Sequence, residues 1–164
     1  MYSEILVPTD GSKAAERAID HALDIAKTYG ARVHALYVVD TSIYTSLDAG
    51  ADVVIDALER EGDVATKHVR AAAEEAGVEV VSEVVTGTAY RSIHDYIDSH
   101  DIDLVVMGTH GRTGLSHYLL GSVTERVVRT CPVPVLTVRM SDEEAESAAS
   151  SDDAASTGDA NESA

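Results

Sequence analysis

The sequence has no Phe or Trp and a single cysteine, Cys131. Without large aromatic rings, the core must be built from Val, Ile, Leu and Ala. One cysteine cannot form an internal disulfide, which fits a reducing compartment. No Cys/His cluster has the spacing of zinc ligands. Cys131 itself ends a predicted helix beside a proline, so we expect a small buried apolar residue rather than a reactive thiol.

Long apolar runs are also missing from the 164 residues. No run approaches the roughly 18–20 residues of a membrane-spanning helix. The first residues, Met1 to Val7, have neither a basic segment nor a cleavage-like site, so we expect no signal peptide. The length is that of one domain with a full core. These absences predict a cytoplasmic protein with no membrane partner.

Positive charge is scarce, with 12 Lys and Arg against 29 Asp and Glu and a net charge of −17. Residues 141–164 hold 8 acids and no Lys or Arg, which leaves residues 1–140 with a net charge of −9. A nucleic-acid-binding surface would be basic, so no nucleic-acid partner is expected. The composition resembles that of proteins from a high-salt cytoplasm, although an ordinary acidic cytosolic protein is the alternative.

Strand-like and helix-like runs alternate along the first 140 residues. This alternation predicts an α/β fold, in which a doubly wound parallel sheet carries helices on both faces. Residues 141–164 lack large apolar side chains, so we predict a domain over 1–140 and a disordered acidic segment over 141–164. The expected strands are Ser3–Val7, Arg32–Val39, Val78–Val85, Leu104–Met107 and Val135–Val138; the expected helices lie between Ser12 and Gly30 and over Ala51–Ala76, Ala89–Ser99 and Val123–Thr130.

A glycine-rich segment, Gly108-x2-Gly111-x9-Gly121-Ser122, lies between the fourth strand and the last helix. Glycines let backbone N–H groups approach a phosphate, and a helix N-terminus adds unpaired donors and partial positive charge. The spacing matches neither the P-loop nor the dinucleotide fingerprint. Two alternatives remain: the glycines are turn residues, and Ser122 caps the last helix in the capping box that ends at Glu125.

A second polar segment, Pro8-Thr9-Asp10, follows the first strand. In parallel sheets, ligands bind beyond the carboxyl ends of the strands, at the switch point of strand order. We therefore expect this segment and Gly108 to lie in one crevice, although about 100 residues separate them in the sequence. For Asp10 the alternative is turn and helix-start chemistry.

These two segments, with Val38 in Tyr-Val-Val-Asp and the final Cys-Pro-Val-Pro-Val-Leu-Thr-Val, resemble the universal stress protein family over about residues 1–140. Members with this glycine pattern bind ATP. The resemblance implies a five-stranded sheet in the order 3-2-1-4-5, ATP as ligand with Mg²⁺, and a homodimer joined through the last strand, Val135–Val138. An exposed edge strand can pair with a second copy, which agrees with that dimer.

The family's ATP-binding positions carry over onto this sequence residue by residue. Asp10 and Val38 would serve the adenosine end, although core packing is the alternative for Val38. Arg112 would pair with a phosphate oxygen or be solvated, and His110 would contribute its backbone rather than act as a general base. The complete implied set is Pro8, Thr9, Asp10, Val38, Met107, Gly108, His110, Gly111, Arg112, Gly121, Ser122, Val123 and Thr124.

The leading functional hypothesis is a cytoplasmic, ATP-binding stress-response protein that acts as a nucleotide-dependent sensor or binding module. Hydrolysis is expected to be slow or absent, because the sequence offers no evident water-activating residue. An adenylating enzyme would carry a Ser-Gly-Gly-x-Asp loop after the first strand, and that loop is missing. The other alternative is an interaction module whose pocket is empty or binds another ligand.

Overall fold

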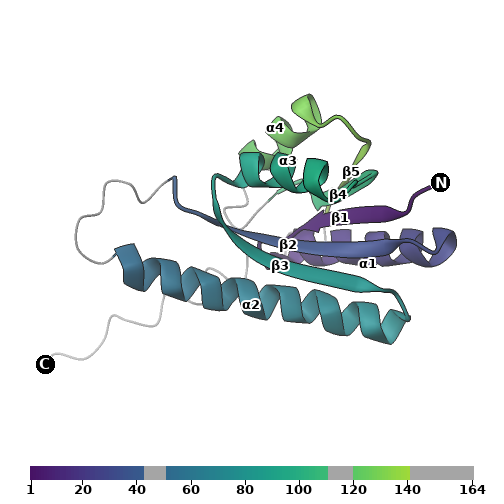
Figure 1. Cartoon of the computed structure of the whole chain (residues 1–164), viewed down its shortest axis with the longest axis horizontal. Helices are drawn as coiled ribbons and strands as arrows, with labels where there is room; N and C mark the ends of the chain where they lie inside the picture. The colour runs from purple at the N-terminus through teal and green to yellow at the C-terminus, as the bar shows by residue number, and fades with distance from the viewer. Residues whose placement is uncertain (43–50, 111–119, 141–164) are drawn as a thin grey trace, which may run out of the picture.

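The computed structural model describes residues 1–42, 51–110 and 120–140, of which 51 and 52 are described by their backbone alone. The predicted disordered segment 141–164 lies outside these residues. So does most of the polar stretch Asp40–Gly50, whose composition predicts a loop. In chain order the elements are β1 Glu4–Pro8, α1 Lys13–Tyr29, β2 Arg32–Asp40, α2 Ala51–Ala76, β3 Val80–Gly87, α3 Ala89–Ser99, β4 Leu104–Gly108, α4 Ser122–Thr130 and β5 Val135–Val138 (Figure 1).

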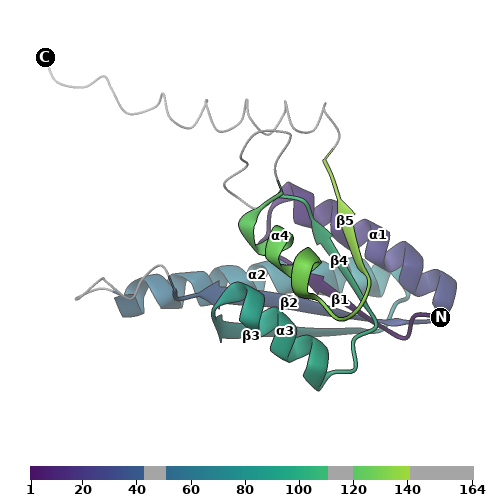
Figure 2. The ribbon, with the colours of Figure 1, turned by 90° about the horizontal axis from the view of Figure 1, so that it is seen from above.

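The five strands form one sheet in the order β3-β2-β1-β4-β5, and every neighbouring pair is parallel. Helices α1 and α2 cover one face, and α3 and α4 cover the other (Figures 1 and 2). The predicted doubly wound α/β class and strand order are therefore confirmed. The order reverses between β1 and β4, so the carboxyl ends of these two strands flank the switch point.

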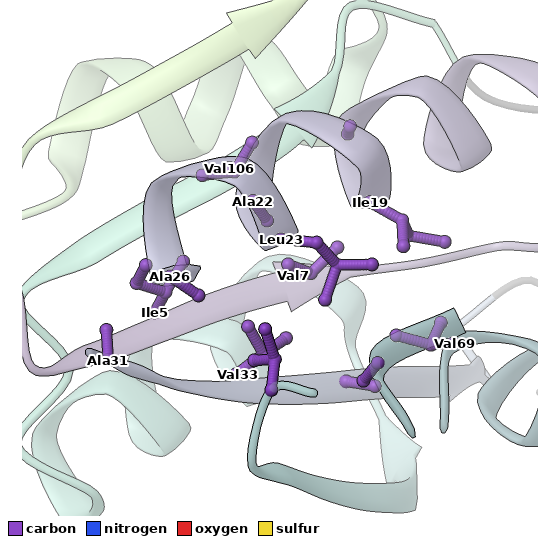
Figure 3. Close-up of a cluster of buried hydrophobic side chains, with 14 of the residues drawn as sticks. Ile5, Val7, Ile19, Ala22, Leu23, Ala26, Ala31, Val33, Val69 and Val106 are labelled. Atoms are coloured by element: carbon purple, nitrogen blue, oxygen red, sulfur yellow. The ribbon is translucent and has the colours of Figure 1, made fainter. Parts of the chain in front are cut away.

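Alternation along the strands divides the buried side chains between two cores. Ile5 and Val7 of β1 face α1 and α2, whereas Leu6 faces α3 and α4. The first core lies between the sheet and helices α1 and α2, and the second between the sheet and helices α3 and α4. Figure 3 shows the first core, in which Leu23 of α1 and Val69 of α2 pack onto the sheet. Both cores consist almost entirely of aliphatic side chains, as the absence of Phe and Trp requires.

Local chemistry sets both ends of α1. The Ser12 hydroxyl accepts a hydrogen bond from the Ala15 N–H at 3.3 Å, and Gly30 follows the helix in the left-handed conformation with φ of 68°. Both ends agree with the sequence prediction.

Several predicted boundaries were wrong by one or two residues. β1, β2, β3 and β4 each extend further than expected, to Pro8, Asp40, Gly87 and Gly108. The third strand begins at Val80 rather than Val78, because the Val78 N–H closes the end of α2 with a 2.8 Å bond to the Ala73 carbonyl. The extended ends bring Pro8 and Gly108 to the same edge of the sheet.

A buried polar chain fastens α3 to the sheet. His34 of β2 lies 2.7 Å from a Glu4 carboxylate oxygen through Nε2 and 3.1 Å from the Tyr96 hydroxyl through Nδ1. Burial, with the charges of Glu83 and Glu4, raises the pKa of Tyr96 to about 12. The phenol therefore stays protonated and keeps this contact at neutral pH. The chain lies toward the amino ends of the strands and leaves the N-terminus of α3 at the opposite end.

Candidate functional site

A cavity of about 290 Å³ lies at the carboxyl ends of β1, β2 and β4, between the first turns of α1, α3 and α4. Its size is close to the lower end of small-molecule sites. The lining residues are Pro8, Thr9, Asp10, Ala15, Leu36, Val38, Ala89, Ile93, Met107, Gly108, His110, Gly121, Ser122, Val123 and Thr124.

The cavity brings together both polar segments that the sequence singled out. Pro8-Thr9-Asp10 contributes from the end of β1, and Gly108 with Gly121 contributes from the glycine-rich segment. Every residue of the implied ATP set lines this cavity except Gly111 and Arg112, which lie outside the described residues. Their roles toward ATP stay predictions.

The first turn of α4 presents free backbone donors to the cavity. Gly121 is the N-cap, with its N–H bound to the Thr109 carbonyl at 2.8 Å and its own carbonyl accepting from the Glu125 N–H at 2.8 Å. The next three N–H groups, of Ser122, Val123 and Thr124, have no acceptor within the part of the chain that the structure describes. An anion placed against them would satisfy these donors and meet the positive end of the helix dipole.

The capping-box alternative for Ser122 is wrong. The helix begins at Ser122 and its N-cap is Gly121, with no side-chain capping bond. The predicted box places the cap one residue too late, because the Gly121 carbonyl already accepts the first intrahelical bond. The Ser122 hydroxyl is therefore not used to close the helix.

Gly108 is held from two sides at the floor of the cavity. The buried hydroxyl of Thr124 donates to its carbonyl at 2.9 Å. On the other side, a β-carbon at Gly108 would lie 2.9 Å from the Ala14 carbonyl carbon and 3.0 Å from the Ala14 oxygen. Close packing against α1 thus requires glycine here, independently of any phosphate.

Asp10 takes part in a turn and also lines the cavity. One of its carboxylate oxygens, Oδ1, accepts from the Ser12 N–H at 3.0 Å, and the Thr9 hydroxyl oxygen accepts from the Gly11 N–H at 3.2 Å. The turn alternative is therefore correct, and it does not compete with exposure to the cavity. The turn fixes where the carboxylate points.

His110 offers a polar atom that the described protein leaves unused. Its Nδ1 lies 3.0 Å from the Thr109 hydroxyl, whereas its Nε2 is buried without a hydrogen-bond partner among the described residues. Buried polar atoms usually find a partner. A ligand group in the cavity would supply one.

Sequence reasoning missed four lining residues, namely Ala15, Leu36, Ala89 and Ile93. They are apolar residues that carry no motif, and only the packing of α1 and α3 on the sheet places them here. Val38 is half-buried beside the second core and also lines the cavity, so both of its predicted roles agree with its position.

Asp40 caps α3 from the neighbouring strand. Its Oδ2 accepts from the Ala89 N–H at 3.2 Å, while its Oδ1 accepts from the N–H and hydroxyl of Ser42 at 2.9 and 2.5 Å. Burial acts to raise the pKa of this carboxyl, but the bonds from Ser42 and Ala89 outweigh it and the pKa is lowered. Asp40 thereby positions the cavity wall formed by α3.

We expect Asp40→Asn to be less stable than the native protein near neutral pH. Because the folded-state pKa is lowered, the stabilisation is present above the ordinary value of 3.8 and is lost as the pH falls through the folded-state pKa. The difference in urea midpoint should therefore shrink on acidification. Asp95→Asn, an exposed carboxylate on α3, is the control. Parallel pH profiles for the two variants would contradict the capping role.

The described residues contain no group of three or more His, Cys, Asp or Glu placed to hold a metal ion. Over the same residues, no helix combines the length and apolar character needed to cross a bilayer. Cys131 is half-buried, and burial raises the pKa of its thiol, as expected for an unreactive packing residue.

Known proteins of this fold match nearly the whole of the described chain. The model of the universal stress protein family matches residues 1–139. The universal stress protein MJ0531 of Methanocaldococcus jannaschii is 42% identical over 141 residues, covering 85% of this chain and 83% of that protein. The structure of MJ0577, from the same organism, has a TM-score of 0.78 at 31% identity and covers 87% of this chain and 99% of its own. A universal stress protein solved in complex with cAMP has a TM-score of 0.63 at 26% identity, and the match covers 85% of this chain and 98% of that protein.

Proposed function

The chain belongs to the universal stress protein family, and we propose that it is a cytoplasmic stress-response protein that binds ATP in the cavity at the carboxyl ends of β1, β2 and β4. It would act as a nucleotide-dependent sensor or binding module. The observation that carries this proposal is the first turn of α4, which lines the cavity and whose N–H groups of Ser122, Val123 and Thr124 have no acceptor among the described residues.

The two ends of the cavity differ in a way that suits a nucleotide. Apolar side chains from β2 and α3, including Leu36, Val38 and Ile93, form a wall suited to a base. Helix donors and the His110 Nε2 suit phosphate oxygens. A 26% identical relative of the same fold was solved with cAMP, which is also an adenine nucleotide.

The residues present fit ATP better than they fit a protein-held metal. Among the described lining residues, Asp10 is the one with a carboxylate, and this group already accepts a hydrogen bond from the Ser12 N–H. Mg²⁺ is commonly held by substrate phosphates, one or two carboxylates and water. We therefore expect Mg²⁺ to arrive with the nucleotide, where it neutralises phosphate charge.

Fast hydrolysis is not part of the proposal. Efficient phosphoryl transfer needs a residue that orients the attacking water and a cation that stabilises the transferred group. Within the described lining, His110 and Asp10 are the titratable groups, and each already contacts a neighbouring residue. The residues thus favour binding and retention of the nucleotide over its turnover.

Calorimetric titration of the full chain with ATP and Mg²⁺ tests the proposal. The net charge of −17 repels ATP at low salt, but at about 1 M KCl the Debye length is about 3 Å, so local donors dominate. We expect the affinity at about 1 M KCl to equal or exceed that at about 0.1 M. Absence of binding by folded protein at both salt concentrations would favour the interaction-module alternative.

We also propose that the protein forms a homodimer through β5. This strand lies at one edge of the sheet, and its Leu136 side chain is 38% exposed. The other edge strand, β3, presents the polar side chains of Glu83 and Thr86 to solvent. An apolar edge strand with open backbone groups is suited to pairing with a second copy.

Leu136→Lys is expected to convert the dimer to a monomer, because it places a charge at the centre of the proposed interface. Light scattering coupled to size-exclusion chromatography measures the mass. Val53→Lys, at an exposed position on α2, is the matched control and should remain dimeric. A native protein that is monomeric, or a Leu136→Lys variant that stays dimeric, would contradict this interface.

A further inference from the structure

Two arginines converge on one tyrosine at the surface between α3 and α4. The Arg126 guanidinium lies over the Tyr90 ring at 3.9 Å from its centroid, and the Arg91 Nε donates to the Tyr90 hydroxyl at 2.8 Å. Arg91 and Arg126 are exposed and Tyr90 is half-buried. We call these three residues the Arg–Tyr patch. It lies outside the lining of the nucleotide cavity.

The two guanidinium groups of the Arg–Tyr patch contact an uncharged side chain instead of a carboxylate. The Tyr90 ring and the Tyr90 hydroxyl, which these arginines contact, are both uncharged. Among the described residues, neither guanidinium forms an ion pair with a carboxylate. Glu125, next to Arg126 in the sequence, is instead paired with Arg129 at 2.9 Å. Asp95, one turn along α3 from Arg91, makes no ion pair with it.

Arginines without a carboxylate partner are unusual in a chain where acids outnumber bases by 29 to 12. α4 carries two arginines and one glutamate, a formal charge of +1, whereas α1 is neutral, α3 carries −1 and α2 carries −4. α4 is therefore the described helix with a net positive charge, and Arg126 is its arginine without a carboxylate partner among the described residues, so acidic residues close to this helix would be attracted to it.

Such a run follows directly in the sequence. Residues 141–164 contain eight acids and no Lys or Arg, and four of the acids fall within 142–146. The described chain reaches Met140 just beyond the carboxyl end of β5. Arg91 lies in the first turn of α3 and Arg126 in the second turn of α4, and both helices begin at the same end of the parallel sheet. β5 and α4 are neighbours (Figures 1 and 2).

From this juxtaposition we propose that the Arg–Tyr patch binds the acidic residues of 141–164 of the same chain. The reach is ample, because an extended chain spans about 3.3 Å per residue and the domain has a radius of gyration of about 14 Å. Attachment to the same chain gives an effective concentration on the order of millimolar, so a weak charge contact is sufficient. A nucleic acid, the other polyanion that arginines attract, is disfavoured by the net charge of −17. The proposal does not depend on nucleotide binding.

Paramagnetic relaxation in the full-length protein tests this contact. A nitroxide is attached at Ser150→Cys in a Cys131→Ala background, and amide relaxation is read over the described residues. At about 0.1 M KCl we expect the relaxation enhancement at the amides of Tyr90, Arg91 and Arg126 to exceed that on α2 by about fivefold. At about 1 M KCl the Debye length is about 3 Å, so most of this difference should disappear.

Matched variants separate a specific contact from general attraction. Arg91→Gln with Arg126→Gln should remove the enhancement, whereas Arg60→Gln with Lys67→Gln, which removes the same charge from α2, should leave it unchanged. Amide spectra report whether each variant is folded. Enhancement spread evenly over the surface, insensitivity to the patch variant, or enhancement that appears only between differently labelled copies would overturn the proposal.

Discussion

Gly108→Ala is expected to lower the free energy of unfolding by about 3 kcal/mol, the upper part of the range for overpacked cores. The new β-carbon would lie 2.9 Å from the Ala14 carbonyl carbon. Because that neighbour is backbone at the start of α1, no side-chain rotation relieves the contact. The end of β4 and the first turn of α1 must separate, which also distorts the floor of the cavity.

Urea denaturation followed by circular dichroism measures this loss. Met107→Leu, on the same strand and also in the cavity lining, is the volume-conserving control and should cost less than about 1.5 kcal/mol. A Gly108→Ala variant as stable as the native protein would mean that α1 can move away from β4 at no cost. Packing against Ala14 would then not be the reason for glycine at this position.

Gly121→Val is expected to weaken ATP binding by about 100-fold or more, which corresponds to about 2.8 kcal/mol. Gly121 has φ of −59° and ψ of 148°, a conformation open to any residue. Backbone strain therefore does not require glycine here. A branched side chain would instead project from the cavity wall, beside the free donors of α4.

This variant should stay folded, with a urea midpoint near the native value, so that its calorimetric titration reports on the site alone. Arg129→Gln, at the other end of the same helix, is the control and should bind as the native protein does. If Gly121→Val keeps native affinity, the phosphates do not lie against α4. The two glycines of one motif thus have different expected effects, one on folding and one on binding.

Much of the fold could be predicted because its signals are local. Alternating strands and helices indicated a doubly wound sheet, and the ends of α1 followed from Ser12 and Gly30. The two polar segments at the ends of β1 and β4 meet in one cavity because parallel strands place their carboxyl ends together.

The remaining features depend on contacts between distant segments. Asp40 caps α3 from the end of another strand, and a pattern within one segment does not reveal such a cap. The packing role of Gly108 depends on Ala14, which is 94 residues away in the sequence (108 − 14). Ser122 looked like a helix cap because its capping box is a correct local motif, but the hydrogen bonds of Gly121 move the helix start by one residue.

An ATP titration of isotope-labelled protein in the presence of Mg²⁺, with the backbone amide shifts read by NMR, tests most directly whether ATP binds in this cavity. If the phosphates lie against α4, the largest shifts fall on Ser122, Val123 and Thr124, with smaller ones at Ala89. Shifts confined to the opposite end of the sheet, around the groove that Lys27 and Arg32 line, would contradict it. So would the absence of any shift at millimolar ATP.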